Sequence, residues 1–390
     1  MFQIAHFIPY LGTAMGGPVQ SMAAYTDLVS SLGFSVEVYS ASQPSDGPSV
    51  RLNPSVQSIT APVTGWGSFR RSPGLWSQAQ AADFKLTHSH CLWTDVNRLA
   101  AEMSRQRHLP HLLAPCGMLA PGALRHRWWK KFPVRLWFQN QALREAQCLH
   151  AKSEKEYEDI RRLGLTNPVA IIPNPIQLPL PSVPTDAEKF RRAFNLPPEK
   201  NILLYLGRLN PVKGLPRLIQ AWAAVPEFHS RWSLVVAGPD ERDCRRELEA
   251  TIRQTNCAES IRFTGELDHT QKWHALAAAK LFVMPSDFEN FGSAIVEALH
   301  AGLPVITTTG TPWKELPAAN AGWWIEPEVP ALTATLREAF QLPEDKILLM
   351  NQNARQFAAR FRPEQAAADL ADVYRWLLDK AARPHCVLIN

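Results

Sequence analysis

The chain has 390 residues, a length that favours two or more domains. Hydrophobic residues make up 46% of it and charged residues 20%, which is the composition of a soluble globular protein. Lysine and arginine number 41 against 36 aspartates and glutamates, and the resulting net charge of +5 is too small to indicate nucleic acid as a partner.

The chain alternates short apolar runs with longer amphipathic runs, a pattern typical of α/β proteins with parallel strands. A strand is expected at 2–8 and an alternating strand at 35–39, joined by a helix that starts near Val19 and ends at Gly33. These elements form one β-loop-α-β unit, and residues 40–55 are expected to be a polar loop.

A glycine-containing loop at 12–18 separates the first strand from this helix. Its adjacent glycines, Gly16 and Gly17, would let the backbone approach a ligand closely. The spacing is not that of a dinucleotide-binding fingerprint, so an ordinary turn between strand and helix is the alternative.

Two histidines, His88 and His90, lie in a segment that we expect to be a loop after an apolar run. There His90 could bond a sugar hydroxyl, and the alternative is a pair of surface or core histidines. We expect no metal site, because no cluster of Asp, Glu or Cys accompanies them and no two aspartates in the chain lie two residues apart.

Residues 125–138 interleave cations with aromatic side chains. The cations are Arg125, Arg127, Lys130, Lys131 and Arg135, and the aromatic residues are Trp128, Trp129, Phe132, Trp137 and Phe138. Such a segment can lie in a membrane interface with its cations toward anionic headgroups. The equal alternative is an amphipathic helix with its aromatic residues in the core and its cations in solvent.

A strand at 169–173 runs into a proline-rich stretch that continues to Pro184, and proline ends regular structure and stiffens a connection. We therefore place one domain at 1–175 and a second at 176–362, followed by a C-terminal helical segment at 363–382. The second domain has strand candidates at 201–206, 234–238, 261–263, 280–285 and 304–307. Two similar halves joined by a hinge suggest a cleft between them.

The most specific pattern in the chain pairs Glu289 with Glu297 across a Phe-Gly turn, between a strand at 281–284 and a helix at 293–301. The unpaired N–H groups of such a helix start form an anion site suited to the phosphates of a nucleotide sugar. Glu289 could accept hydrogen bonds from sugar hydroxyls and Glu297 could hold a ribose diol. Alternatively, Glu289 is an acid favoured by the helix dipole and Glu297 is a solvated helix residue. The other residues expected to bind the donor here are Asn290, Phe291, Gly292 and Ser293.

A second pattern follows the strand at 201–206, where Gly207 and Arg208 are followed by Lys213. Two fixed cations at the end of a strand can neutralise a diphosphate, most of all when charge grows on the leaving phosphate. The alternative is a solvated loop with two surface cations.

The six cysteines are scattered and form no C-x-x-C pair, so neither a zinc site nor a disulfide framework is expected. No apolar stretch is long enough to span a bilayer, and the first residues lack the charge and apolar pattern of a signal peptide. We expect a reducing cytoplasmic setting, with docking on the inner face of the cytoplasmic membrane if residues 125–138 bind lipid.

On these motifs the chain resembles glycosyltransferase family 4, whose members have the GT-B fold. The likeness covers nearly the whole chain and is carried by Glu289 with Glu297 and by Gly207-Arg208 with Lys213. The segment 172–175 is similar to the interdomain motif of the family, and residues 88–93 are similar to a motif of a branch that builds bacterial surface polysaccharides. A later motif of that branch has a basic residue where this chain has Cys116, so the role of that basic side chain in relatives is absent here or supplied by another residue.

The resemblance implies two Rossmann-like domains facing a central cleft, with the last helix crossing back to the first domain. It implies a retaining hexosyltransferase that uses a nucleotide-diphosphate sugar and needs no metal or other cofactor, with a saccharide or lipid-linked saccharide as acceptor. Arg208 and Lys213 would bind the diphosphate, Glu289 the transferred sugar and Glu297 the ribose. Gly16 and Gly17 would approach the diphosphate from the other domain.

Two other functions fit the same organisation. A sugar-nucleotide epimerase would bind the same donor and turn it over without an acceptor. A non-catalytic binding protein of this fold would be indicated by loss of either glutamate or of both cations, and all four are present.

Overall fold

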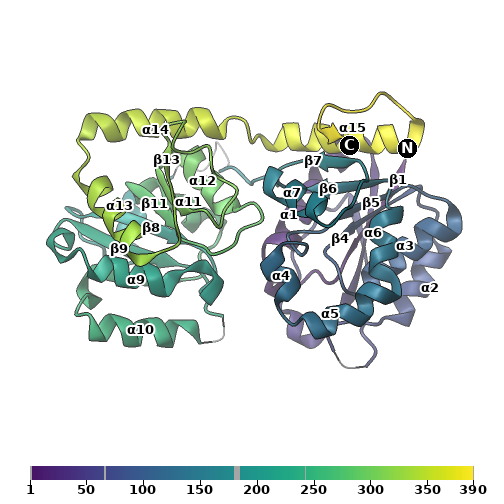
Figure 1. Ribbon diagram of the computed structural model, residues 1–390, viewed down its shortest axis with the longest axis horizontal. Coiled ribbons are helices and arrows are strands. Elements are labelled where there is room, and N and C mark those ends of the chain that lie inside the picture. The colour runs from purple at the N-terminus through teal and green to yellow at the C-terminus, as the bar shows by residue number, and fades with distance from the viewer. Residues whose placement is uncertain (1, 66, 180–184, 242, 390) are drawn as a thin grey trace. The chain divides into compact units, whose positions relative to one another are not determined.

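The computed structural model in Figure 1 describes residues 2–65, 67–179, 185–241 and 243–389. The chain forms two compact units. Unit 1 runs up to Ile176 and resumes at Phe361, and unit 2 runs from Gln177 to Arg360. The end of the expected proline-rich connection, residues 180–184, lies outside the described residues.

Unit 1 is built on an eight-stranded sheet, counted over the described residues, in the order β14-β7-β6-β5-β4-β1-β2-β3. Its strands are β1 Gln3–Ile8, β2 Ser35–Ser42, β3 Val56–Pro62, β4 Leu86–His90, β5 His111–Ala114, β6 Cys148–Ala151, β7 Val169–Ile171 and β14 Val387–Leu388. All neighbours pair in parallel except β14, which pairs antiparallel with β7 at the edge of the sheet. The sequence did not indicate β14.

Helices cover both faces of this sheet, as parallel sheets require. The helices are α1 Gly17–Ser31, α2 Pro73–Ala81, α3 Asp95–Arg107, α4 Pro121–Arg125, α5 Trp128–Val134, α6 Asn140–Glu145, α7 Glu154–Arg162 and α15 Pro363–Asp379. Alternation along β1 sends Ile4 and Ile8 into a core with α1 and α15, and sends Ala5 and Phe7 into a core with α2 and α3. Helix α15 therefore packs on unit 1, against α1.

Unit 2 has a six-stranded parallel sheet within the described residues, in the order β10-β9-β8-β11-β12-β13. The strands are β8 Asn201–Leu206, β9 Trp232–Ala237, β10 Ile261–Gly265, β11 Leu281–Met284, β12 Val305–Thr308 and β13 Gly322–Ile325. The helices are α8 Ala187–Ala193, α9 Leu215–Ala223, α10 Cys244–Gln254, α11 His269–Ala278, α12 Ser293–Ala301, α13 Val329–Gln341 and α14 Glu344–Ala358. Strands β8 and β11 lie at the centre of the sheet, and their side chains are almost fully buried.

Two sequence expectations are wrong in unit 1. Residues 40–55 are not simply a polar loop, because β2 continues to Ser42 and a short 3₁₀ helix follows at Pro44–Asp46. Ser40 is tolerated in the sheet because its hydroxyl bonds that of Thr60 on β3, at 3.0 Å. His88 and His90 do not lie in a loop but within β4. We find no helix in the described parts of the chain with the length and apolar character needed to cross a bilayer.

Candidate active site

The order of strands in unit 2 marks a position for a ligand. The chain passes from β8 to β9 and β10 on one side, then returns to β11, β12 and β13 on the other side of β8. Ligands of open parallel sheets bind outside the carboxyl ends of the strands at such a reversal. The two loops with the predicted donor residues follow β8 and β11, the strands on either side of it.

These two loops are in direct contact. Gly214, after the 3₁₀ turn Pro211–Lys213, has a positive φ of 70°, and a Cβ at this position would lie 2.0 Å from the carbonyl oxygen of Pro285. Asp287 N also donates to Val212 O at 2.8 Å. Only glycine permits so close a backbone approach, and the approach brings Lys213 beside Glu289.

Lys213 and Glu289 form an ion pair, and their side chains are only 15% and 12% exposed. Ser286 Oγ also donates to Glu289 Oε1, at 3.1 Å. The carboxylate is thus fixed by a cation and a hydroxyl from two loops. A fixed carboxylate beside a fixed cation can orient a sugar hydroxyl and a phosphate at the same time.

Arg208 is held by a residue that the sequence did not indicate. Its Nη1 donates to Glu241 Oε1 at 2.7 Å, and Asn210 Nδ2 donates to Glu241 Oε2 at 2.6 Å. Gly207 is fixed in turn, because its N–H donates to Ala237 O on β9 at 2.9 Å. Arg208 therefore stands at the end of β8 with its charge balanced by Glu241.

Glu297 lies in the second turn of α12, where only a tenth of its side chain is exposed. Its Oε1 accepts from Lys272 Nζ at 2.5 Å, and Lys272 belongs to α11. Lys272 is a second partner that the sequence did not indicate. It supplies the charge that allows a carboxylate to remain at a mostly buried position.

The start of α12 is the place where the sequence predicts an anion site. Gly292 precedes Ser293, the first residue of the helix, and no side chain of the described residues caps it. Helix starts of this kind bind anions through backbone N–H groups. Asn290 lies in the loop before the helix, while Phe291 is buried and its carbonyl accepts from Trp313 Nε1 at 2.7 Å. Phe291 thus anchors the loop through its buried side chain and its backbone carbonyl.

In unit 1 the predicted glycines lie at the start of α1. Gly16 precedes the helix with a φ of 71°, a conformation that favours glycine, and Gly17 is its first residue. A Cβ on Gly17 would meet no atom within 4 Å. Open space beside this backbone is what approach by a ligand requires.

His90 belongs to a buried network of imidazoles. His90 Nε2 and His6 Nδ1 are 3.0 Å apart, and the hydroxyl of Tyr374 on α15 lies 2.9 Å from His6 Nε2 and 2.8 Å from His88 Nδ1. The chain of contacts continues from His88 Nε2 to His150 Nδ1, 3.3 Å away. His90 is 1% exposed, so its expected contact with a sugar hydroxyl stays a prediction.

Burial lowers the pKa of His6 to about 3 and lowers the pKa values of His88, His90 and His150 well below 6.5. These imidazoles are therefore neutral at pH 7. Nitrogens of His6, His88 and His90 lie within 4.8 Å of one another, close enough for a metal ion, yet hydrogen bonds among these rings and to Tyr374 already engage them.

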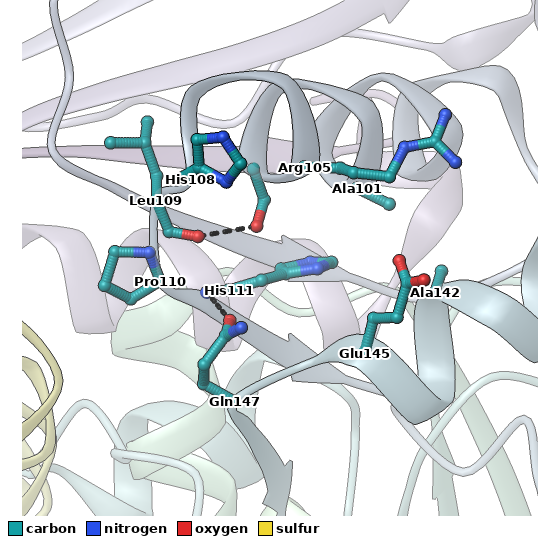
Figure 2. Close-up of a pocket in the computed structure, with 10 residues that line it drawn as sticks. Ala101, Arg105, His108, Leu109, Pro110, His111, Ala142, Glu145 and Gln147 are labelled. Atoms are coloured by element: carbon teal, nitrogen blue, oxygen red, sulfur yellow. Dashed lines mark hydrogen bonds between the residues drawn. The ribbon is translucent and has the colours of Figure 1, made fainter.

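A different hollow lies elsewhere in unit 1 (Figure 2). It has a volume of about 470 Å³ and is lined by α3, the start of β5 and α6, with Arg105, His111 and Glu145 among its residues. His111 N donates there to Gln147 Oε1, at 2.6 Å. It contains none of the predicted site residues and lies at the amino end of β5, away from the carboxyl ends of the strands.

Segment 125–138 begins at the last residue of α4, contains the whole of α5, and includes most of a π-helical turn at Arg135–Gln139. Their large apolar side chains are not in the core, since between 53% and 65% of each remains exposed at Trp128, Trp129, Phe132, Leu136 and Trp137. The core-facing interpretation is therefore wrong for this segment, apart from Phe138, which is buried. Lys131 folds back, and its ammonium group donates to the carbonyls of Ala123 and His126.

Comparisons with known proteins agree with this organisation. A family model described as glycosyl transferases group 1 matches residues 186–357, and one described as a glycosyl transferase 4-like domain matches residues 16–175. A D-inositol 3-phosphate glycosyltransferase of Streptomyces bingchenggensis is 30% identical over 319 residues, which are 77% of this chain and 68% of the relative. A GDP-mannose:cellobiosyl-diphosphopolyprenol alpha-mannosyltransferase of Komagataeibacter xylinus is 31% identical over 196 residues, about half of each chain at 50% and 49%.

Two solved structures share the fold at 20% identity. A sucrose-phosphate synthase from Thermosynechococcus elongatus has a TM-score of 0.78, with 98% of this chain and 100% of that one covered. The Anabaena protein HepE in complex with UDP-glucose has a TM-score of 0.74, with 96% and 99% covered. The expected fold class, two Rossmann-like domains of the GT-B type, is confirmed. Because the two family models match successive parts of the chain and one relative is 30% identical over 77% of it, this protein belongs to glycosyltransferase family 4.

Proposed function

We propose that this protein is a retaining glycosyltransferase that moves a sugar from a nucleotide-diphosphate sugar to a lipid-linked saccharide during synthesis of a cell-surface polysaccharide. The observation that carries the proposal is the ion pair of Lys213 and Glu289 between the loops that follow β8 and β11. Glu289 belongs to the loop that leads to the start of α12, where phosphate is expected to bind.

In this proposal the donor diphosphate binds to Arg208, Lys213 and the start of α12. The diphosphate then shares the charge of Lys213, and the carboxylate of Glu289 turns to the hydroxyls of the transferred sugar. Glu297 binds the ribose, while Gly16 and Gly17 offer backbone to the diphosphate. As the bond to the leaving phosphate breaks, the cations stabilise its growing charge, and that phosphate takes the proton of the attacking acceptor hydroxyl.

We further propose that transfer needs no divalent metal. Three cationic side chains lie on the loop after β8 and on α11: Arg208, Lys213 and Lys272. They supply the positive charge that a metal ion provides in other phosphate chemistry. Activity should therefore persist in excess EDTA, and a complete loss that magnesium or manganese restores would contradict this part of the proposal.

The lipid-linked acceptor is supported by a relative and by a surface. The mannosyltransferase of Komagataeibacter xylinus, by its name, acts on a sugar linked to diphosphopolyprenol. The exposed aromatic residues of segment 125–138 lie among cations, a combination that suits an anionic membrane interface. We propose that this segment docks the protein on the inner face of the cytoplasmic membrane, where such acceptors are presented.

The proposal is tested first by ligand stabilisation and then by transfer. The purified protein is heated with UDP, GDP or ADP; a nucleotide that binds only the folded state at a hundred times its Kd adds about 2.7 kcal/mol of stability. The matching nucleotide sugar is then supplied with a polyprenyl-diphosphate saccharide, and the anomeric configuration of the product is read by NMR. We expect retention. Conversion of the donor without an acceptor would identify an epimerase, and binding with no turnover of any donor would identify a non-catalytic protein.

A further inference from the structure

Cys91 and Cys116 lie side by side at the carboxyl ends of two neighbouring strands of unit 1. β4 ends at His90 and β5 ends at Ala114, which are partners in the sheet, and Cys91 N donates to Ala114 O at 2.9 Å. The two thiols are hydrogen-bonded to each other. Cys91 and Cys116 thus follow neighbouring strands, which lie about 4.8 Å apart in a sheet.

The two cysteines differ in access and in chemical state. Cys91 is fully buried, whereas Cys116 is partly exposed. The hydrogen bond from Cys91 and the ammonium group of Lys152 lower the pKa of Cys116, while that hydrogen bond and burial raise the pKa of Cys91. The Cys116 sulfur is thus the better nucleophile, and the Cys91 sulfur donates a proton to it.

The backbone at both positions is one that cysteine seldom adopts. Cys91 has a φ of 67° and Cys116 a φ of 54°, and Trp93 follows with 72°. Strained residues of this kind cluster where a site needs a particular side chain, since glycine would otherwise fit with less strain. Lys152, which is 2% exposed and whose pKa burial lowers to about 8, completes the cluster.

We propose that Cys91 and Cys116 form a redox-active dithiol site that reacts with low-molecular-weight disulfides. The Cys116 thiolate attacks one sulfur of the small disulfide, whose S–S bond breaks and releases one thiolate. The sulfur of Cys91 then attacks Cys116 Sγ, displaces the second small thiolate and gives up its proton to it. Two protein thiols are oxidised to one disulfide, and one small disulfide is reduced to two thiols.

The chain contains a second cysteine pair that serves as a control. Cys148 and Cys386 also interact electrostatically in unit 1, but both are buried, and burial raises the pKa of each to about 12. Proximity is therefore common to the two pairs, and of the two only the first combines it with a partly exposed residue and a stabilised thiolate. Cys148 and Cys386 should stay reduced under conditions that oxidise Cys91 and Cys116.

The test treats the full chain with glutathione disulfide, blocks the remaining thiols with N-ethylmaleimide and maps the cysteines by peptide mass spectrometry. We expect a Cys91–Cys116 cross-link that dithiothreitol reverses, formed at least tenfold faster than any modification of Cys148 or Cys386. Cys91→Ser should instead keep one glutathione on Cys116, and Cys116→Ser should leave Cys91 unmodified.

Cys91→Gly provides a second resolving-thiol variant, because glycine suits the positive φ at this position. It too should keep glutathione on Cys116. If the native protein forms no such cross-link, or if Cys116 reacts no faster than Cys148, the proposal is wrong. The readout does not depend on sugar transfer, so its failure and the failure of the proposed enzymatic function can be told apart.

Discussion

Glu289 and Glu297 each pair with a lysine but hold different positions. Glu289 lies in the loop after β11 and is bound by Lys213 from the loop after β8. Glu297 lies within α12 and is bound by Lys272 of α11. The first pair therefore stands between the two loops expected to surround the diphosphate and sugar, and the second stands along the helix that would carry the ribose.

Exchange of each glutamate should separate the two roles. Glu289→Gln keeps the size of the side chain and removes its charge, so kcat should fall by roughly 10²–10³-fold while nucleotide affinity changes little. Glu297→Ala removes a binding group, so the nucleotide Kd should rise about tenfold, which is about 1.4 kcal/mol. Steady-state kinetics and calorimetric titration with the nucleotide measure the two effects.

Glu259→Gln is the matched control, because this exposed glutamate lies in unit 2 outside the site. It should change neither parameter. Equal and mild effects of Glu289→Gln and Glu297→Ala in folded protein would contradict the division of roles.

Sequence could place Glu289 and Lys213 because they occupy short loops between predictable strands and helices, and Glu297 because it lies within one of those helices. It could not place Glu241 or Lys272, whose partners Arg208 and Glu297 lie 33 and 25 positions away along the chain. For His90 the sequence failed for another reason. The four consecutive polar residues that end β4 look like a solvated loop, and partners on β1, β5, β6 and α15 make their burial tolerable.

The strands of unit 2 could be predicted from the sequence because parallel strands that are covered on both faces are continuous apolar runs. Strand β8 has the predicted bounds, and helix α12 also begins and ends where predicted. The short strand β14 could not be read, because its two residues gain their structure from pairing with β7. Segment 125–138 could be recognised by composition, but its exposure depends on how α4 and α5 fold.

Helix α15 is tied to the sheet of unit 1 by the hydroxyl of Tyr374. Tyr374→Phe removes the atom that bonds both His6 Nε2 and His88 Nδ1, and leaves two buried nitrogens without that partner. Such a loss costs about 1–3 kcal/mol. The unfolding midpoint of unit 1 in urea should fall accordingly. Tyr157→Phe, at a partly exposed position on α7, should change stability by less than about 0.5 kcal/mol, and equal midpoints for both variants would contradict a structural role of this hydroxyl.

We predict that two adjacent lysines of the exposed segment 125–138 have different roles, one in membrane binding and one in stability. Lys130 is exposed, so Lys130→Gln should weaken binding to anionic liposomes by about 1 kcal/mol, or roughly fivefold. Lys131 donates to carbonyls of α4 and the following turn, so Lys131→Gln should lower stability more than it lowers liposome binding. Trp128→Ala should weaken binding with little change in stability, because 59% of this side chain is exposed. Co-sedimentation at varied anionic content and salt measures these differences.

Salt should reduce the attachment by screening, most strongly for liposomes rich in anionic lipid. If the native protein stays in the supernatant at low salt with every lipid composition, the segment does not bind membranes. Its exposed aromatic residues would then require another partner.

Buried neutral histidines are concentrated in unit 1 of the molecule. Burial lowers the pKa of His6 to about 3 and of His111 to about 4, and lowers those of His88, His90 and His150 well below 6.5. In unit 2 the histidine whose pKa burial lowers, among the described residues, is the partly exposed His229. Acid should therefore affect the two units differently.

The direction in which pH changes the stability of unit 1 depends on whether the folded or the unfolded state binds more protons. In the unfolded chain these histidines protonate near pH 6.5, whereas in folded unit 1 they stay neutral to a much lower pH. Between these limits the unfolded state binds more protons, so the stability of unit 1 falls as the pH falls below 6.5. One pH unit below 6.5, the five histidines together lower the free energy of unfolding by an amount comparable to the whole stability of a domain. Burial raises the pKa values of Asp27 and Asp159, which offsets a part of this loss at lower pH.

Unit 1 should consequently unfold between about pH 5 and 6, while unit 2 keeps its structure to a lower pH. Hydrogen exchange followed by mass spectrometry, corrected for the intrinsic exchange rate at each pH, reports on the two units separately. Peptides from β1 and β4 should lose protection before peptides from β8 and β11. His111→Gln removes one titrating group and should move the transition of unit 1 to lower pH, provided that the amide replaces the hydrogen bond to Ser89. Loss of protection in both units at one pH, or retention of unit 1 at pH 4, would show that the imidazole network does not control acid stability.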